Sequence, residues 1–596
     1  MQQVDFTTLT AAVRELQLDW IPARVESVYQ RDRYTLALSL RTLNKRGWIA
    51  ISWHPQAARI VLTDPPPRIP DTFTLSQQLR SVLGGLAMTG MEMVSPWERL
   101  VRLTFATRPG AEALYYLYVE PIGKYSNLTL TDADNLIVTT AHQVSNKQSS
   151  VRTIETGRPY EVPPSLTDPM PNIEESIERW IDRVSLIPDK LNQRLVRSYR
   201  GLSTILMNEL ITVAGLDPVQ TTDTLARGDW EKLFEYWQIW LRTLTQVEGY
   251  KFNPQLTDNG FSVMGWRCPE HFDKLSVSPV EGDDRATPVA SVNNAIETYY
   301  SRILDREAFS QLKHQLTQKL GTILAKLRVK ANTFKAKLQE STGADEYRTN
   351  ADLLMSYLQE WQPGMKEIIL NDFETGEPIK IKLEPEKNAI QNAQFLYKRH
   401  QKLKRAKLAV DPLLAAVQAE IDYLEQVEES VLQLQADDTN DLREMLQTLL
   451  EIKKELIDTG YFPNADRLAK AELAETKPHS LTTPSGFELL IGRNNRQNDK
   501  LTFKTATEYD LWFHAQEIAG SHGLLRITPG AVAEEADLQF TANAVAYYSR
   551  SRQSQAVPVV YTATKHVYKP KGAKPGMVIY KHEQIIWGHP QTLVPT

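Results

Sequence analysis

The sequence predicts a multidomain α+β protein, and three observations lead to that prediction. First, its 596 residues are several times the ~100–200 residues of a usual domain. Second, apolar residues alternate with polar ones near both ends of the chain, as in antiparallel strands, but recur every three or four positions in the middle, as in long helices. Third, proline-rich stretches interrupt these patterns. We therefore expect α+β domains at both ends, joined by helical segments.

The N-terminal region, residues 1–172, is expected to form one α+β domain. Helical spacing between Phe6 and Leu16 precedes the first strand-like runs, and a second helical run follows the proline-rich loop 62–70. The alternating runs are residues 24–40, 47–53, 98–105, 113–120 and 127–132. A proline-rich stretch at 160–171 is the expected exit linker.

A helical region is expected at residues 173–290. Within it, residues 199–216 have the pattern of a helix-hairpin-helix, with Gly201 and Gly215 at the turns. Hairpins of this kind often present backbone amides to a phosphate, but more often they simply pack against their neighbours. Both interpretations stay open at this point.

Residues 291–465 are expected to form a long antiparallel coiled-coil arm with a small tip at about 342–392. Apolar residues keep three-four spacing on both sides of this tip. They are Ile296, Tyr299, Ile303, Leu312, Leu316, Leu320, Ile323 and Leu327 before it, and Val417, Ile421, Leu424, Val431, Leu434, Leu442, Leu446, Leu449 and Leu456 after it. Between them, residues 368–387 alternate and turn at Thr375-Gly376 like a hairpin. The alternative is a helical domain packed on its neighbours.

Charge on the arm is uneven. The net charge of −5 gives no global case for a nucleic-acid partner, so any RNA-binding surface must be local. Residues 398–407 contain several cations and no carboxylate. A run of charge is usually a solvated helix face, but here no glutamate follows at i,i+4 to pair the cations. The candidates for contact with ribosomal RNA, which we call the arm patch, are Lys398, Arg399, Lys402, Lys404 and Arg405.

The C-terminal region, residues 480–596, is expected to be a compact α+β module with short strands and glycine turns. Its most unusual stretch, residues 493–503, is rich in side-chain amides, which can donate and accept hydrogen bonds at once and so suit phosphates, sugars and base edges. The alternative is a loop that satisfies its own backbone through Asn and Asp turns. The candidate rRNA contacts here are Asn494, Asn495, Arg496, Gln497, Asn498, His514 and His522.

Several classes of protein are disfavoured by composition. The single cysteine, Cys268, excludes an internal disulfide framework and fits a reducing compartment. There is no run of ~18 apolar residues and no apolar leader. The histidines are scattered, without metal-ligand spacing, and no glycine-rich phosphate loop precedes a helix. We therefore expect a cytoplasmic protein without a cofactor, a metal or catalytic residues.

Several motifs together resemble the NFACT family, whose bacterial members are Rqc2 homologues and carry the older label fibronectin-binding protein A-like. Residues 492–526 and 564–580 resemble its C-terminal NFACT-R domain. Residues 120–132, 199–210 and 383–407 resemble, in order, its N-terminal NFACT-N motif, its helix-hairpin-helix segment and its coiled-coil arm. The resemblance thus extends over the whole chain and implies an N-terminal fold like that of the formamidopyrimidine glycosylases.

The resemblance also implies a function in ribosome-associated quality control. Such a factor binds a large ribosomal subunit obstructed by peptidyl-tRNA and its nascent chain. It recruits tRNA, alanyl-tRNA in bacterial relatives, and promotes mRNA-independent tailing of the stalled chain, which marks it for degradation. The ribosome forms the peptide bond, so the factor is not expected to be an enzyme. We expect it to act as a monomer on the ribosome, without a membrane partner.

Four candidate tRNA-binding residues come from the same resemblance. The family has an Asp-Arg pair where this chain has Glu98 and Arg99, so the arginine fork is retained while the carboxylate lies on a longer side chain. The family's Gly-Arg-His-Ser-Asn run reads as residues 123–127 here, which leaves Lys124 and Asn127 as candidates. Without the resemblance, Glu98 and Arg99 would be read as a surface ion pair. We expect Arg99 to lie exposed at the start of a strand.

Three other functions are alternatives to ribosome-associated quality control. A DNA glycosylase of the formamidopyrimidine type needs a proline nucleophile at position 2, where this chain has Gln2, and a zinc finger that one cysteine cannot build. A fibronectin-binding surface adhesin would need export by a route without a leader. A DNA- or RNA-binding coiled-coil scaffold without tailing activity would leave the amide-rich and basic modules unexplained.

Overall fold

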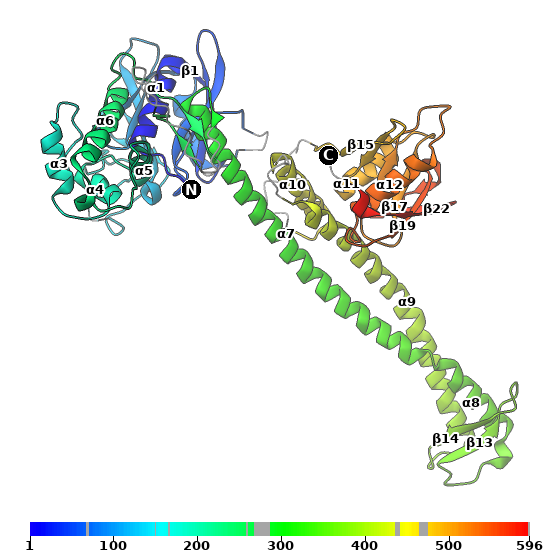
Figure 1. Ribbon diagram of the computed structural model, residues 1–596. Coiled ribbons are helices and arrows are strands. Elements are labelled where there is room, and N and C mark those ends of the chain that lie inside the picture. Colours follow the sequence, from blue (N-terminus) through cyan, green and yellow to red (C-terminus); the bar gives the residue numbers. More distant parts are fainter. Residues whose placement is uncertain are drawn as a thin grey trace. The chain divides into compact units, whose positions relative to one another are not determined.

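The computed structural model describes residues 1–66, 71–149, 151–164, 167–257, 260–266, 287–435, 442–463 and 475–593 (Figure 1). Cys268 and the expected arm boundary at residue 465 lie outside these ranges. The chain divides into two compact units after Asp305, and each is described by itself. The predicted multidomain α+β class, with an N-terminal sheet and a long helix, is confirmed.

The first unit contains a nine-stranded antiparallel sheet. Its strand order is β4-β3-β2-β1-β5-β6-β7-β8-β9. The strands are β1 (Ala23–Asp32), β2 (Thr35–Arg41), β3 (Arg46–Ser52), β4 (Arg59–Thr63), β5 (Ala87–Met93), β6 (Val101–Ala106), β7 (Ala113–Glu120), β8 (Asn127–Asp132) and β9 (Ile137–Thr140). Helix α1 (Phe6–Trp20) begins at the N-cap residue Asp5, which accepts a hydrogen bond from the Thr8 amide at 2.8 Å. It buries its apolar side chains in the same core as the sheet, and α2 (Thr74–Leu83) also joins this core.

Helices α3 (Ile177–Ser185), α4 (Leu191–Ser198), α5 (Thr204–Val213) and α6 (Arg227–Leu244) complete the first unit together with three short strands. These strands are β10 (Gln255–Leu256), β11 (Phe261–Ser262) and β12 (Thr287–Pro288). The core between the helices is built on tryptophans: the Trp180 ring lies 5.6 Å from Trp237, which lies 4.9 Å from Trp240. Trp97, from the loop before β6, lies 5.5 Å from Trp240 and so joins the sheet region to these helices.

The second unit is organised around long helices. Helix α7 (Val292–Ser341) spans 50 residues and begins in the first unit. After it come α8 (Ala344–Ser356), the hairpin β13 (Glu367–Asn371) and β14 (Pro378–Lys382), α9 (Ala389–Gln433) and α10 (Leu442–Asp458). One apolar core joins α7, α9 and α10, with Leu316, Leu320 and Leu324 packed in the same cluster as Ile421, Leu424 and Leu449. The hairpin and α8 enclose a separate small core.

The rest of the second unit is an α+β module at residues 475–593. A six-stranded sheet has the order β15-β16-β18-β17-β19-β22. Its strands are β15 (His479–Thr482), β16 (Glu488–Ile491), β17 (Leu511–Ala515), β18 (Gly523–Leu525), β19 (Val557–Ala563) and β22 (Gln584–Gly588). Helix α12 (Glu535–Tyr547) packs on the face that carries Phe513 and Val559. A two-stranded ribbon, β20 (Val567–Tyr568) and β21 (Ile579–Tyr580), packs against Trp512.

Residues 495–505 of this module are helical: α11 (Asn495–Lys500) continues into a π-helical turn at Leu501–Thr505. From the sequence, the alternative to an RNA contact for residues 493–503 is a loop, whereas the structure is helical from Asn495 onward. Asn494 explains the difference, because its extended backbone and side-chain oxygen form an N-cap that accepts the Gln497 amide at 2.9 Å.

Candidate nucleic-acid interface

The loop before β6 carries Glu98 and Arg99 and is held rigidly within the first unit. Trp97 has a positive φ of 63° and its ring lies 4.9 Å from that of Phe6. Gly201, in the hairpin turn, has a φ of +79°, and a Cβ there would lie 3.0 Å from the Trp97 ring. Glycine is therefore required at 201 both by backbone conformation and by this close approach.

Within this loop, Glu98 and Arg99 contact different elements. A Glu98 carboxylate oxygen lies 3.9 Å from the Arg200 guanidinium, while Arg99 Nη1 donates to the Val4 carbonyl at 3.2 Å. Burial lowers the pKa of Arg99, against the opposing charges of Asp5 and Glu98. The expectation of an exposed arginine at a strand start is wrong. Arg99 is half-buried in the loop, two residues before β6 begins, because its guanidinium lies against the N-terminal segment at Val4.

Lys124 lies within the short turn Gly123–Tyr125, whereas Asn127 begins β8, and the two differ in exposure. Lys124 is exposed, and its ammonium lies 4.9 Å from the ring of Tyr125, which is 71% exposed. Asn127 is buried. Its Nδ2 donates to the His142 carbonyl at 2.8 Å, and its Oδ1 accepts the His142 amide at 3.0 Å. The Asn127 amide thus ties the start of β8 to the end of β9, while the cation and ring beside it face solvent.

The structure brings these two loci to the same N-terminal segment. Arg99 contacts Val4, and a Cβ on Gly123 would lie 3.6 Å from the side chain of Gln3. Sequence reasoning missed Arg200, which pairs with Glu98 from the hairpin turn. No spacing rule links positions about a hundred residues apart, so only the fold could show this pair.

The arm patch lies on α9 and is exposed at all five positions, Lys398, Arg399, Lys402, Lys404 and Arg405. Arg399 stacks over the Tyr347 ring at 4.8 Å. His400, between them, is instead buried, with Nδ1 2.8 Å from the Ala344 carbonyl oxygen. Over the described ranges, the structure records no ion pair for Lys402, Lys404 or Arg405. These cations therefore face solvent without a carboxylate partner among the residues that the structure describes.

The amide-rich residues of α11 have the opposite environment. Asn494, Asn495, Gln497 and Asn498 are buried. Asn494 Nδ2 donates to Glu451 on α10 at 2.8 Å, and Gln497 Nε2 donates to the Thr476 carbonyl at 2.8 Å. Asn498 Oδ1 accepts the His522 amide at 3.1 Å. The side chains that were expected to contact RNA are thus engaged with the protein's own polar groups.

The contact between α10 and α11 is largely one of carboxylates with amides and arginines, and we call it the α10–α11 seam. Asn495 Nδ2 lies 3.4 Å from a carboxylate oxygen of Glu455, which also accepts the Tyr423 hydroxyl at 2.8 Å. Burial raises the pKa of Glu455 to about 7. Two ion pairs border the seam: Arg493 with Glu444 at 3.0 Å, and Arg496 with Asp458.

The two candidate histidines lie beneath the ribbon. His514 stacks on Trp512 with centroids 5.8 Å apart, and its ring lies 5.4 Å from that of His522. Burial lowers the pKa of His514 to about 4, and burial together with His514 lowers the pKa of His522. Both rings are therefore neutral at pH 7 and offer no charge to a phosphate.

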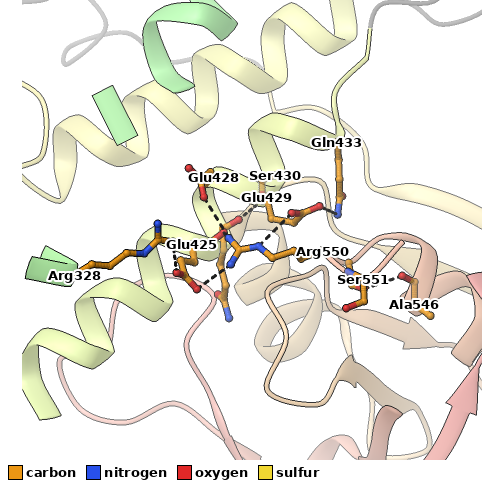
Figure 2. A network of polar contacts seen from close by, with 11 residues as sticks. Arg328, Glu425, Glu428, Glu429, Ser430, Gln433, Ala546, Arg550 and Ser551 are labelled. Carbon is orange, nitrogen blue, oxygen red and sulfur yellow. Dashed lines mark hydrogen bonds and ion pairs between the residues drawn. The ribbon is translucent and has the colours of Figure 1, made fainter. Parts of the chain in front are cut away.

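A second contact fixes the C-terminal module to α9 (Figure 2). Arg550 donates from Nη1 to Glu425 at 2.9 Å and from Nη2 to Glu428 at 3.3 Å, and its Nε lies 3.8 Å from Glu429. Glu425 also accepts Arg328 Nη2, from α7, at 2.6 Å. Burial alone would raise the pKa of Glu425, but the positive charges of Arg328 and Arg550 outweigh it and hold the pKa below its usual range. One carboxylate thus links α7, α9 and the module.

Comparison with known protein families gives two matches that follow one another along the chain. Residues 5–473 match the NFACT N-terminal and middle domains, and residues 477–582 match the NFACT protein RNA-binding domain. The chain belongs to the NFACT family.

Curated relatives align with this NFACT chain over nearly its whole length. The Rqc2 homolog RqcH of Bacillus subtilis (strain 168) is 27% identical over 590 residues, covering 97% of this chain and 96% of the relative. The Rqc2 homolog RqcH of Streptococcus pneumoniae serotype 2 (strain D39 / NCTC 7466) is 28% identical over 582 residues, covering 96% and 95%. A solved structure, the C-terminal part of the fibronectin/fibrinogen-binding protein from Streptococcus suis, is 28% identical, with a TM-score of 0.36, and covers 47% of this chain and 95% of that one.

The match to the NFACT RNA-binding domain includes α11, both histidines and the β20–β21 ribbon, and it ends before β22. Arg550 also lies inside it. Among the described residues, none of the helices has the length and apolar composition needed to cross a bilayer. In the same ranges, no three His, Cys, Asp or Glu side chains gather in a way that could hold a metal ion.

Proposed function

We propose that this NFACT protein is a ribosome-associated quality-control factor. It binds large ribosomal subunits obstructed by peptidyl-tRNA, recruits tRNA and promotes mRNA-independent tailing of the stalled chain. One observation carries the proposal: the two NFACT matches follow one another from residue 5 to 582, and relatives named Rqc2 homolog RqcH align over nearly the full chain. In this proposal the ribosome forms the peptide bond, and the factor contributes binding and positioning.

Transfer RNA binding is assigned to the first unit. Arg99 donates one hydrogen bond to Val4, and a guanidinium has five donors in a planar fork. The fork therefore retains donors for a phosphate or a base edge. Lys124 and the exposed ring of Tyr125 add a cation and a stacking surface from the neighbouring turn. In this assignment Glu98 does not contact tRNA but positions its loop by pairing with Arg200. Asn127 likewise fixes the turn that carries Lys124, through its hydrogen bond to His142.

Contact with the large subunit is assigned to the arm patch. A phosphate backbone is bound through cations that release its condensed counterions. The five cations of the arm patch are exposed, and none of them forms an ion pair with another described residue, so they meet this requirement as they stand. Because such binding rests on phosphate contacts, it should weaken steeply between low and physiological salt.

Profiling of nascent chains tests the proposal. In cells that lack the gene, the untemplated tails on stalled fragments should disappear, and the wild-type gene should restore them. The residue most directly tested is Arg99: Arg99→Ala should restore few tails, and Arg99→Lys should restore less than half of them, because lysine keeps the charge but not the fork. Glu98→Asp should restore them fully.

Since Arg99 is half-buried, the thermal unfolding of each variant must be measured alongside. A stable Arg99→Ala protein that restores all tails would remove Arg99 from the tRNA site. Tails that persist without the gene would refute the elongation role itself. Alanine as the added residue would identify alanyl-tRNA as the recruited species.

A further inference from the structure

The β20–β21 ribbon of the NFACT RNA-binding domain has two unlike faces. Val567 and Tyr580 are paired across the ribbon and pack inward against Trp512. Tyr568 and Ile579, the other pair, point outward and are 46% and 56% exposed. Because side chains alternate along a strand, an aromatic and an aliphatic side chain thus lie together on a solvated surface.

The segment that contains the ribbon is strongly basic. Residues 564–582 include five lysines and two histidines but no aspartate or glutamate. These lysines are Lys565, Lys569, Lys571, Lys574 and Lys581. The positive charge is therefore compensated only by carboxylates from other segments.

The loop between the two strands uses part of this charge inside the protein. Lys569 pairs with Asp499. Lys574 lies 4.0 Å from the Tyr461 ring and 4.9 Å from the Tyr423 ring, on the side of α9 and α10. Gly576 has a φ of +78°, and a Cβ there would lie 2.6 Å from Asn495 Oδ1, so the loop fits closely against the α10–α11 seam. Lys569 and Lys574 are thus engaged by the protein itself, whereas Lys571 between them is exposed.

The opposite end of the ribbon is available. Lys565 and Lys581 are exposed, and within the described part of the chain neither takes part in a recorded ion pair. They lie close together, because the Lys581 amide donates to the His566 carbonyl at 3.1 Å. The half-buried ring of His566 and the exposed ring of His582 lie 4.7 Å apart beside them. Cations and flat rings are thus adjacent to the outward pair Tyr568 and Ile579.

We propose that the outward face of the β20–β21 ribbon, formed by Tyr568 and Ile579 and flanked by Lys565 and Lys581, binds unpaired RNA. This inference rests on the proposed RNA-binding function and names the surface and the kind of RNA. Phosphates would contact the lysines, and a base would stack on Tyr568. A paired helix keeps its bases stacked inside and offers mainly backbone and groove, so it would leave the aromatic pair without a ligand.

The α10–α11 seam, in contrast, is excluded from this role by its own contacts. Its amides are buried and bonded to Glu451, Thr476 and His522. RNA could reach them only if α10 left the domain. The ribbon face needs no such rearrangement, which is why it is the preferred surface.

Fluorescence anisotropy with the full-length protein tests the proposal, using a labelled oligouridylate as unpaired RNA and a labelled hairpin stem as paired RNA. Tyr568→Ala should weaken oligouridylate binding by about tenfold, in the range measured for loss of one base–aromatic stack. Tyr568→Phe keeps the ring and should bind within about twofold of wild type. Neither change should alter stem binding, and thermal unfolding should be the same for all three proteins.

A charge-reversed pair adds an independent measurement. Lys565→Glu with Lys581→Glu should weaken oligouridylate binding and reduce the slope of log affinity against log salt by about 1.4, as expected for two contacts to a single strand. Lys232→Glu with Lys251→Glu, at exposed positions of the first unit, changes the net charge equally and should have little effect.

Three outcomes would overturn the ribbon assignment: full oligouridylate affinity in Tyr568→Ala, equal losses in Tyr568→Ala and Tyr568→Phe, or an equal loss on the stem. In each case RNA binding by the wild type and tailing in cells would still support the proposed function. If the wild-type protein bound neither RNA, the RNA-binding role itself would fail, and the ribbon inference with it.

Discussion

The arm patch and the α10–α11 seam make an instructive pair, because both are dense polar clusters that the sequence assigned to ribosomal RNA. In the structure the arm patch is exposed throughout, whereas the amides of the seam are buried. The arm patch has no recorded carboxylate partner at Lys402, Lys404 or Arg405 within the described ranges, but Asn494 and Asn495 each meet a glutamate of α10. A high local density of polar residues in the sequence therefore does not distinguish an exposed surface that could bind a ligand from a buried contact between two helices.

The difference follows from the chemistry of the side chains. Lysine and arginine place a charge at the end of a long stem, and burying that charge without a partner is costly. Asparagine and glutamine are short and neutral, and they can donate and accept within one plane. A cluster of them is thus suited to satisfy buried carboxylates, and that is how Glu451 and Glu455 are held.

The largest expected effect comes from removing one amide of the seam. Asn494→Ala deletes the N-cap of α11 and the hydrogen bond to Glu451, so the free energy of unfolding of the RNA-binding domain should fall by about 3 to 4 kcal/mol. Amide hydrogen exchange of α10 and α11 measures this directly. Lys404→Ala, in the arm patch, is the matched control and should change stability by less than about 0.5 kcal/mol. Similar losses of unfolding free energy in both variants would show that the two clusters do not differ in their contribution to stability.

The second prediction concerns pH at the same seam. The pKa of Glu455 is raised from 4.5 to about 7, so between these values the folded state binds more protons than the unfolded state. The contribution of Glu455 to the free energy of unfolding is fully present below about pH 4.5 and is lost as pH rises through about 7. Glu455→Gln keeps an acceptor and removes the titration, so its stability relative to wild type should rise by about 3 kcal/mol between pH 4.5 and pH 8.

His479 and His514, whose pKa values burial lowers to about 3 and about 4, titrate in the opposite sense. Each destabilises the fold as pH falls below about 6.5, because the unfolded state then binds the extra proton. Both histidines are present in wild type and in Glu455→Gln, so their contribution cancels in the difference. Hydrogen exchange across this pH range checks the prediction, and a difference that stays constant with pH would contradict it.

The third prediction concerns the arm patch. Reversing three charges of the arm patch, with Lys402→Glu, Lys404→Glu and Arg405→Glu, should weaken binding to large ribosomal subunits by at least about tenfold, with unfolding unchanged. Binding of free tRNA should be largely intact. The control reverses three exposed cations of the first unit, Arg108, Lys232 and Lys251. Co-sedimentation at two salt concentrations measures both kinds of binding. Equal losses of subunit binding and tRNA binding would show that the two ligands share one site.

The smallest expected effect is at the second contact between α9 and the module. Arg550→Lys retains the charge but cannot reach Glu425, Glu428 and Glu429 together. Because the Arg550 side chain is 37% exposed, solvent screens the contact, and we expect a loss of only about 0.5 to 1 kcal/mol. Faster amide exchange at the end of α12, with α11 unaffected, would show that the two contacts are independent.

The regular parts of the fold were predictable because their signals are local. Leucines at 312, 316 and 320 repeat with the period of one helix turn, and α7 contains them. The strand runs at the N-terminus alternate, and their sheet is observed. The π-helical turn at Leu501–Thr505 was not predicted, because it follows from the N-cap at Asn494 and from packing against distant residues.

The candidate sites were less predictable because exposure depends on contacts between distant segments. Asn494 lies 43 residues from Glu451 in sequence, and Arg550 lies 125 from Glu425. The positions of the polar residues were visible, but which of them face the chain itself was not. Exposure was foreseeable only in the arm patch, where a long helix lacks carboxylates at the pairing distance.

The tryptophan-rich core of the first unit makes the two units optically distinct. Of the 12 tryptophans, only Trp361, Trp512 and Trp587 lie after Asp305. The rings of Trp180, Trp237 and Trp240 lie 4.9 to 5.6 Å from their neighbours, close enough for their excited states to couple. Near-ultraviolet circular dichroism of the intact chain will therefore report mainly on the first unit. Trp512, buried beneath the ribbon, is the one tryptophan of the sequence within residues 477–582, the match to the RNA-binding domain.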